Sequence, residues 1–98
     1  IIDNLKITVR DLNAEDIKNK KLDKKTTGSV ILEISNRSPL IGLLNVNDVI
    51  IEVQKKSVLS SKNLNKQIDE IIKKGNQTLL LTIVNNRNQR RYLGVKLK

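Results

Sequence analysis

The chain has 98 residues, a length that suits one domain with a single modest core. It has no His and no Cys, and its one aromatic residue is Tyr92, so the core must be aliphatic. Without imidazole or thiol groups the chain can form no Ser-His-Asp triad, no thiolate metal site and no disulfide framework. We therefore expect no catalytic residues, no metal ion and no cofactor in this segment.

The net charge is +9, from 19 basic and 10 acidic residues. Such a charge leaves open a basic nucleic-acid-binding module as an alternative function. The sequence has no set of aromatic side chains on which bases could stack, which argues against nucleic acid as a partner. The densest basic clusters, Lys20 to Lys25 and Arg87 to Arg91, are predicted to be solvated faces of the domain.

The composition along the chain is that of one domain, with no internal repeat and no linker rich in Pro, Gly or Ser. The chain begins at Ile1 without a Met, so we expect residues 1–98 to be a fragment of a larger protein. No apolar run approaches the ~20 residues needed to cross a bilayer, so no membrane span is expected in this segment.

Hydrophobic periodicity and turn residues predict five or six short strands, one main helix and one or two short helices. In chain order the expected elements are a strand over 5–10, a short helix over 14–20, a polar loop over 20–27, a strand over 30–34, a turn or short helix from 38, a strand over 48–53, a turn over 54–57, a brief strand at 58–59, a helix over about 61–74, and two strands over 78–84 and 89–97 joined by a hairpin turn. Asn13 and Asp16 are predicted to start the short helix. Ser60 or Ser61 is predicted to start the main helix, and Gly75 to end it. The fold class is therefore α+β, a partly open antiparallel barrel or sandwich capped by the main helix.

Alternation predicts which residues of the strand over 48–53 face the core. Val49, Ile51 and Val53 occupy every second position and are predicted on its inner face. Asp48 follows a turn, so its carboxylate is predicted to bind backbone N–H groups of that loop.

One apolar stripe runs along the main helix at positions i, i+4, i+7 and i+8, formed by Leu64, Ile68, Ile71 and Ile72. Ile71 and Ile72 are predicted to lie in the core. For Leu64 and Ile68 the pattern is compatible with either the core or the lining of a groove.

Several stretches, taken in order, are typical of one family. Residues 4–7 are Asn-Leu-Lys-Ile where that family has a hydrophobic-hydrophobic-Gly-hydrophobic loop, and residues 28–34 match its Gly-x-Val-x-x-x-Val segment except for a final Ile. Residues 38–50 run from Ser-Pro to Asn-Asp-Val-Ile where the family has Ser-Pro to Gly-Asp-Val-Ile, and 78–97 is similar to its terminal strand pair. The sequence thus resembles a PDZ domain in the permuted form of Do-like (HtrA/Deg) bacterial serine endoproteases. The opening, 5–12, is most similar to their second PDZ domain.

Three features depart from the family pattern. Lys6 replaces the loop glycine, which bears on how closely the backbone can curl around a carboxylate. Asn47 replaces the Gly of the Gly-Asp pair, a mild change because Asn tolerates the left-handed conformation. The stretch from Ser38-Pro39 to Leu43-Leu44, where the family has Gly-Leu, is one residue short, so we expect a rearranged loop there.

The resemblance implies a non-catalytic module of a periplasmic serine endoprotease that acts in protein quality control, with the catalytic triad upstream of this segment. The implied partners are peptide C-termini or unfolded-protein segments, bound by strand addition, and other domains or subunits of the same protease. The implied site consists of a carboxylate-binding loop, a pairing strand and an apolar pocket, formed by Leu5, Lys6, Ile7, Thr8, Val9, Leu64 and Ile68. A PDZ domain of another membrane-associated processing protease is an alternative that the resemblance leaves open.

Overall fold

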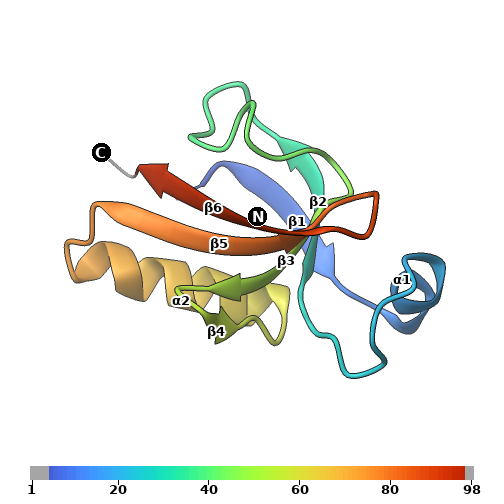
Figure 1. The fold of residues 1–98 in the computed structure, drawn as a ribbon. Helices are drawn as coiled ribbons and strands as arrows, with labels where there is room; N and C mark the ends of the chain where they lie inside the picture. The colour runs from blue at the N-terminus through green and yellow to red at the C-terminus, as the bar shows by residue number, and fades with distance from the viewer. Residues whose placement is uncertain (1–4, 97–98) are drawn as a thin grey trace.

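The computed structural model describes residues 5–96, which form six short strands and two helices (Figure 1). The elements are β1 (Ile7–Asp11), α1 (Ala14–Asn19), β2 (Ser29–Ile34), β3 (Val49–Val53), β4 (Lys56–Ser57), α2 (Ser61–Lys73), β5 (Thr78–Val84) and β6 (Arg90–Lys96). All strand pairs are antiparallel, in the order β1-β2-β3-β5-β6, with β4 paired to β3. In Figure 1, α2 runs alongside the sheet. The short helix α1 lies apart from the sheet, beyond the C-terminal end of β1 (Figure 1). This architecture confirms the predicted α+β fold with one main helix and one short helix.

Two of the predicted elements extend beyond the residues that the structure describes. The predicted first loop begins at Asn4 and the predicted last strand ends at Leu97, and both positions lie outside residues 5–96. Within that range neither α1 nor α2 is long and apolar enough to cross a bilayer.

Both helices begin where the sequence predicts. Asn13 and Asp16 form a capping box, in which the Asp16 N–H donates to Asn13 Oδ1 at 2.9 Å and the Asn13 N–H donates to Asp16 Oδ2 at 3.0 Å. Of the two candidate serines, Ser60 caps α2, since its Oγ accepts the Asn63 N–H at 3.1 Å. Gly75 follows the last turn with φ +78°, a conformation that glycine adopts without steric cost and that commonly ends a helix.

The sheet separates two apolar clusters. The inner cluster lies between the sheet and α2 and contains Leu5, Ile7, Ile31, Leu40, Leu44, Ile50, Val53, Val58, Leu64, Ile68, Leu79, Leu81, Ile83 and Val95. The outer cluster lies on the opposite face of the sheet and contains Val30, Val49, Ile51 and Val84, with Leu12 and Leu22 packed against it. The segment around α1 therefore covers part of the outer face, and α2 covers the inner face.

The prediction that Val49, Ile51 and Val53 share the inner face was wrong for the first two. β3 pairs with β5 through a register shift between Ile50 and Glu52. Such a bulge adds one residue to the strand and so breaks the alternation of faces. Ile50 and Val53 therefore belong to the inner cluster, whereas Val49 and Ile51 belong to the outer one.

The turn after β3 is tighter than the sequence predicts. It consists of Gln54 and Lys55, which have φ values of 51° and 66°, so the next strand occupies 56–57 instead of the expected 58–59. Gln54 holds the turn against β5, because its Oε1 accepts the Leu80 N–H at 3.0 Å and its own N–H donates to the Leu80 carbonyl at 2.8 Å.

Candidate functional site

β1 is an edge strand of the sheet, and α2 lies beside it. Among the described residues β1 pairs with β2 alone, so its second edge has no strand beside it. Cα atoms of α2 come within 8 Å of β1. An edge strand presents backbone N–H and C=O groups with which an added extended chain can pair. This edge, together with the neighbouring face of α2, is the candidate site.

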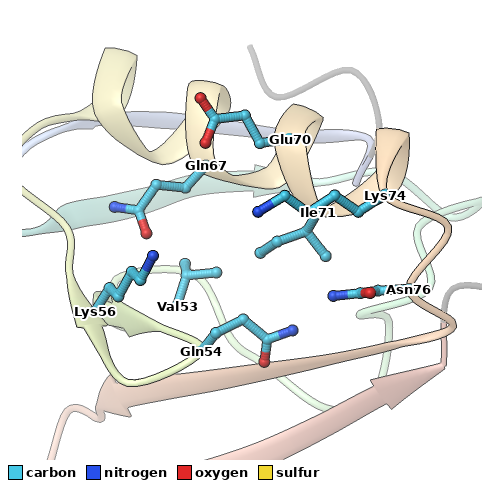
Figure 2. A pocket seen from close by; sticks show the side chains of 8 residues that line it. All are labelled: Val53, Gln54, Lys56, Gln67, Glu70, Ile71, Lys74 and Asn76. Carbon is cyan, nitrogen blue, oxygen red and sulfur yellow. The ribbon is translucent and has the colours of Figure 1, made fainter.

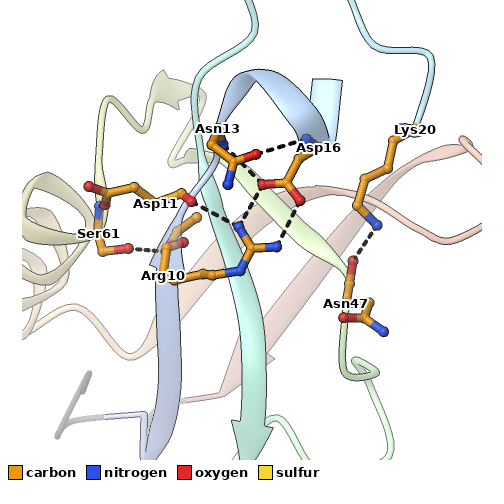
Figure 3. Close-up of polar contacts among 8 residues, drawn as sticks. Arg10, Asp11, Asn13, Asp16, Lys20, Asn47 and Ser61 are labelled. Atoms are coloured by element: carbon orange, nitrogen blue, oxygen red, sulfur yellow. Dashed lines mark hydrogen bonds and ion pairs between the residues drawn. The ribbon is translucent and has the colours of Figure 1, made fainter. Parts of the chain in front are cut away.

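The end of β1 is fixed to the start of α2 by direct hydrogen bonds. Asp11 Oδ1 accepts the backbone N–H of Ser61 at 2.7 Å (Figure 3). Ser61 Oγ lies 2.6 Å from the Oγ of Ser29 in β2. The Ser61 N–H stabilises the charged carboxylate and lowers the pKa of Asp11 below its ordinary value. The spacing between the strand edge and the helix is therefore set at Asp11.

The loop before β1 has a glycine-like backbone although Lys6 occupies the glycine position. Lys6 has φ +52°, in the left-handed region. Ser38 Oγ donates to the Leu5 carbonyl at 2.6 Å, and the Ser35 N–H donates to the Lys6 carbonyl at 3.0 Å. Asn47, at the second replaced glycine, has φ +78°. Both replacements thus preserve the backbone conformation that the glycines would allow.

The predicted pocket residues lie together, but they are buried. Four of them are at most 1% exposed and belong to the inner cluster: Leu5, Ile7, Leu64 and Ile68. Thr8 and Val9 are half-buried in β1, and Lys6 is exposed. In this structure Leu64 and Ile68 are thus part of the core, and the parts of the predicted site open to a partner are the Lys6 loop and the strand edge.

Ser61 and Asn65 lie on the same face of α2 as Ile68 and Ile72, and this part of the row was missed from the sequence. Ser61, which contacts Asp11, is followed at helical spacing by Asn65, Ile68 and Ile72. Asn65 is half-buried, and Ile72 is 36% exposed. The spacing of four, three and four residues from Ser61 could have identified this row, but only with knowledge of which helix face β1 occupies.

The prediction that Ile72 lies in the core was therefore wrong. Ile71 is half-buried and packs against the inner cluster, as expected. Each residue of an α-helix turns the side-chain direction by about 100°, which carries Ile72 out of the buried stripe that runs through Leu64 and Ile71.

A bidentate ion pair anchors α1 to β1. Arg10 Nη1 and Nη2 donate to Asp16 Oδ2 and Oδ1 at 2.6 and 2.7 Å (Figure 3). The Arg10 guanidinium lowers the pKa of Asp16 to about 2. Lys20, which follows α1, donates from Nζ to the Asn47 carbonyl at 3.0 Å. These bonds hold α1 at the end of β1 that also contacts α2.

Asp48 has the role predicted for it, and the basic clusters are solvated as predicted except at Lys20. Asp48 Oδ2 accepts the Asn45 N–H at 2.9 Å, and burial raises the pKa of Asp48. Lys20 is half-buried. The other basic side chains of the two clusters are exposed: Lys21, Lys24, Lys25, Arg87, Arg90 and Arg91.

No family model matches the sequence, and no curated protein sequence matches it. Solved structures do match. The HtrA-type protease AlgW with a decapeptide superposes with a TM-score of 0.68 and 19% identity, over 94% of this chain and 27% of that one. The HtrA3 PDZ domain bound to a phage-derived ligand (FGRWV) has a TM-score of 0.63 and 17% identity, over 94% of this chain and 79% of that one. The PDZ domain of EpsC from Vibrio cholerae has a TM-score of 0.59 and 9% identity, over 94% of each chain.

These likenesses show that residues 5–96 have the PDZ fold. The chain spans about a quarter of the length of the AlgW protease chain that it resembles. The loop at Lys6, the edge of β1 and the adjoining face of α2 form one continuous region of that fold.

Proposed function

We propose that this chain is a non-catalytic PDZ module of a periplasmic HtrA-type serine endoprotease. It binds a peptide C-terminus or an unfolded-protein segment as an added strand on β1, in the service of protein quality control. The observation that carries the proposal is the edge of β1, held beside α2 by the bond between Asp11 and Ser61. Two structural neighbours, an HtrA-type protease with a decapeptide and an HtrA3 PDZ domain with a phage-derived ligand, support a peptide as the class of partner.

The terminal carboxylate of the peptide is placed at the loop of residues 5–7. Lys6 is exposed there and adds a positive charge that a glycine would lack. Hydrogen bonds between charged partners are roughly twice as strong as neutral ones. Since α2 begins beside Asp11 and runs back along β1 (Figure 1), Ile72 lies toward the Lys6 end and offers an apolar contact to the last side chain. The ligand proposed is therefore a peptide with a free carboxylate and an aliphatic last residue.

The buried pocket side chains limit the affinity of such a complex. Leu5 and Ile68 already pack within the inner cluster, so the last peptide side chain gains little new burial there. Main-chain pairing must also offset the entropy lost when the peptide becomes ordered. We expect a dissociation constant on the order of 10–100 μM.

Calorimetric titration with two heptapeptides that both end in Val, one as the acid and one as the amide, tests the proposal. The amide should bind at least about tenfold more weakly, because it removes a charge-assisted hydrogen bond worth about 1.5–3 kcal/mol. Lys6→Ala should weaken binding of the acid, whereas Lys62→Ala, an exposed lysine of α2, should not. Equal affinity for acid and amide would contradict a carboxylate site.

A second candidate function is contact with other domains or subunits of the same protease. The burial of Leu64 and Ile68 favours it, because a pocket filled by the domain's own side chains leaves little space for a ligand. Gel filtration of the full-length protease carrying Ile72→Asp distinguishes the two functions. Loss of the assembled state together with no peptide binding by the unmutated domain would support the assembly function.

A further inference from the structure

A hollow lies between α2 and the turn that joins β3 to β4 (Figure 2). It has a volume of about 260 Å³ and is lined by Val53, Gln54, Lys56, Gln67, Glu70, Ile71, Lys74 and Asn76. Four lining residues come from α2 and its C-cap, and they recur at i, i+3, i+4 and i+7 and so share one helix face: Gln67, Glu70, Ile71 and Lys74. The row from Ser61 to Ile72 lies on a different face, so the hollow is separate from the proposed peptide site.

The hollow combines an apolar floor with two cations. Val53 is buried, and Ile71 is half-buried against the inner cluster. Lys56 belongs to β4 and Lys74 caps the C-terminus of α2, so the two ammonium groups come from different walls (Figure 2). Among residues 5–96 neither lysine forms an ion pair with a carboxylate. The two positive charges are therefore available to a ligand.

The amide groups of the walls are held in place by the fold. Gln54 Oε1 accepts the Leu80 N–H at 3.0 Å. Gln67 Nε2 donates to the Ser57 carbonyl at 3.1 Å. These bonds connect the walls to β5 and β4, so the shape of the hollow does not depend on a ligand to order it.

We propose that this hollow binds a short aliphatic carboxylate. The carbon chain rests on Val53 and Ile71, and the carboxylate lies between the ammonium groups of Lys56 and Lys74. One carboxylate lines the hollow, that of Glu70, and in Figure 2 it points outward from the helix, so the two cations dominate the local charge.

The apolar floor and the small size narrow the ligand further. An inorganic anion between the two ammonium groups would leave the apolar floor in contact with water, whereas a ligand with a hydrocarbon part covers that floor. The volume lies below the range of about 300–1,000 Å³ that suits drug-sized ligands, so the ligand has only a few carbons. A short-chain fatty acid and the aliphatic C-terminal residue of a polypeptide share this chemistry.

Backbone amide shifts of the labelled domain during titration with hexanoate test the proposal. Hexanoate should shift the amides of Gln54 and Asn76, with a dissociation constant on the order of 1 mM for a ligand of this size. The neutral analogue hexanamide should bind at least tenfold more weakly. N-acetylleucine, which imitates a chain end, distinguishes the two sources: shifts with hexanoate alone indicate a free acid, and equal shifts with both indicate that a chain end also fits.

Two double variants supply the matched comparison. Lys56→Gln with Lys74→Gln should weaken hexanoate binding at least tenfold. Lys62→Gln with Lys66→Gln removes the same charge from exposed positions of α2 outside the hollow, and should leave it unchanged. Equal binding of hexanoate and hexanamide, or equal weakening by both double variants, would overturn the proposal. The outcome is distinguishable from that of the proposed function, because a ligand in the hollow should shift the amides of Gln54 and Asn76, whereas a peptide added to β1 should shift those of Thr8 and Val9.

Discussion

The Asp11 carboxylate accepts the backbone N–H of Ser61 at 2.7 Å, which joins the last residue of β1 to the first residue of α2. The bond satisfies one of the N–H groups that have no partner within the helix itself. It also places a negative charge at the positive end of the helix dipole. One side chain therefore stabilises the helix and sets the spacing between the strand edge and the helix that borders it.

Removal of this carboxylate should destabilise the domain. Asp11→Ala leaves the Ser61 N–H without its acceptor, and we expect the melting temperature to fall by several degrees, since loss of a helix N-terminal acceptor costs about 1 kcal/mol. Thermal unfolding followed by circular dichroism measures the change. Glu33→Gln, at an exposed acidic residue of β2, is the control. A melting temperature for Asp11→Ala equal to that of the control would show that the bond contributes nothing.

Acid should weaken the domain through Asp16. The folded pKa of Asp16, about 2, lies below its unfolded value of 3.8, so the stabilisation is fully present above the unfolded value and is lost as the pH falls through the folded one. The full pKa difference corresponds to about 2.4 kcal/mol. Because Arg10 is 38% exposed, solvent screening reduces the expected contribution to about 1–1.5 kcal/mol.

Urea unfolding between pH 5 and pH 2 measures this contribution. The unmutated domain should lose stability over that interval, and Asp16→Asn should lose correspondingly less while being less stable at pH 7. Asp23→Asn, at an exposed loop carboxylate, should keep the dependence of the unmutated domain. A steep acid loss that survives in Asp16→Asn would assign the effect to other carboxylates.

Ile68 and Ile72 should respond very differently to truncation. Ile68→Ala empties a fully buried position of the inner cluster and should cost about 2–5 kcal/mol of the free energy of unfolding. Ile72→Ala should cost less than about 1 kcal/mol, because the side chain is already 36% exposed. Chemical denaturation of both variants decides the point, and comparable losses would place Ile72 in the core after all.

The domain should be more stable with glycine at position 6 than with alanine. Both substitutions remove the lysine side chain, but only glycine adopts φ +52° without steric cost. We expect the free energy of unfolding of the Lys6→Gly variant to be about 1 kcal/mol higher than that of Lys6→Ala. The reason is that the left-handed conformation costs residues other than glycine about 1–2 kcal/mol. The same denaturation experiment measures it, and a more stable alanine variant would contradict the left-handed loop.

Local signals explain why much of the fold could be predicted. The capping box at Asn13 and Asp16 and the glycine after α2 depend on neighbouring residues alone. The bulge in β3 could not be predicted, because it arises from the pairing of β3 with β5 and no residue near Ile51 marks it. The period-two pattern then assigned Ile51 to the wrong face.

The candidate site could be predicted only in part for the same reason. The strand edge and the loop at Lys6 follow from the family resemblance and the order of the strands. The exposure of Ile72 depends on where β1 crosses α2, which helical periodicity alone does not indicate. The hollow beside Lys56 and Lys74 is lined by residues of β3, β4 and α2, which come together only in the folded chain.

The central claim is that a peptide adds as a strand to the edge of β1. Intermolecular nuclear Overhauser effects between a labelled domain and the Val-terminated heptapeptide acid test it most directly. Strand addition predicts contacts from the peptide backbone to Thr8 and Val9, and slower hydrogen exchange of β1 amides in the complex. Contacts confined to the hairpin around Arg87, or to the hollow beside Lys56, with β1 exchange unchanged, would contradict strand addition.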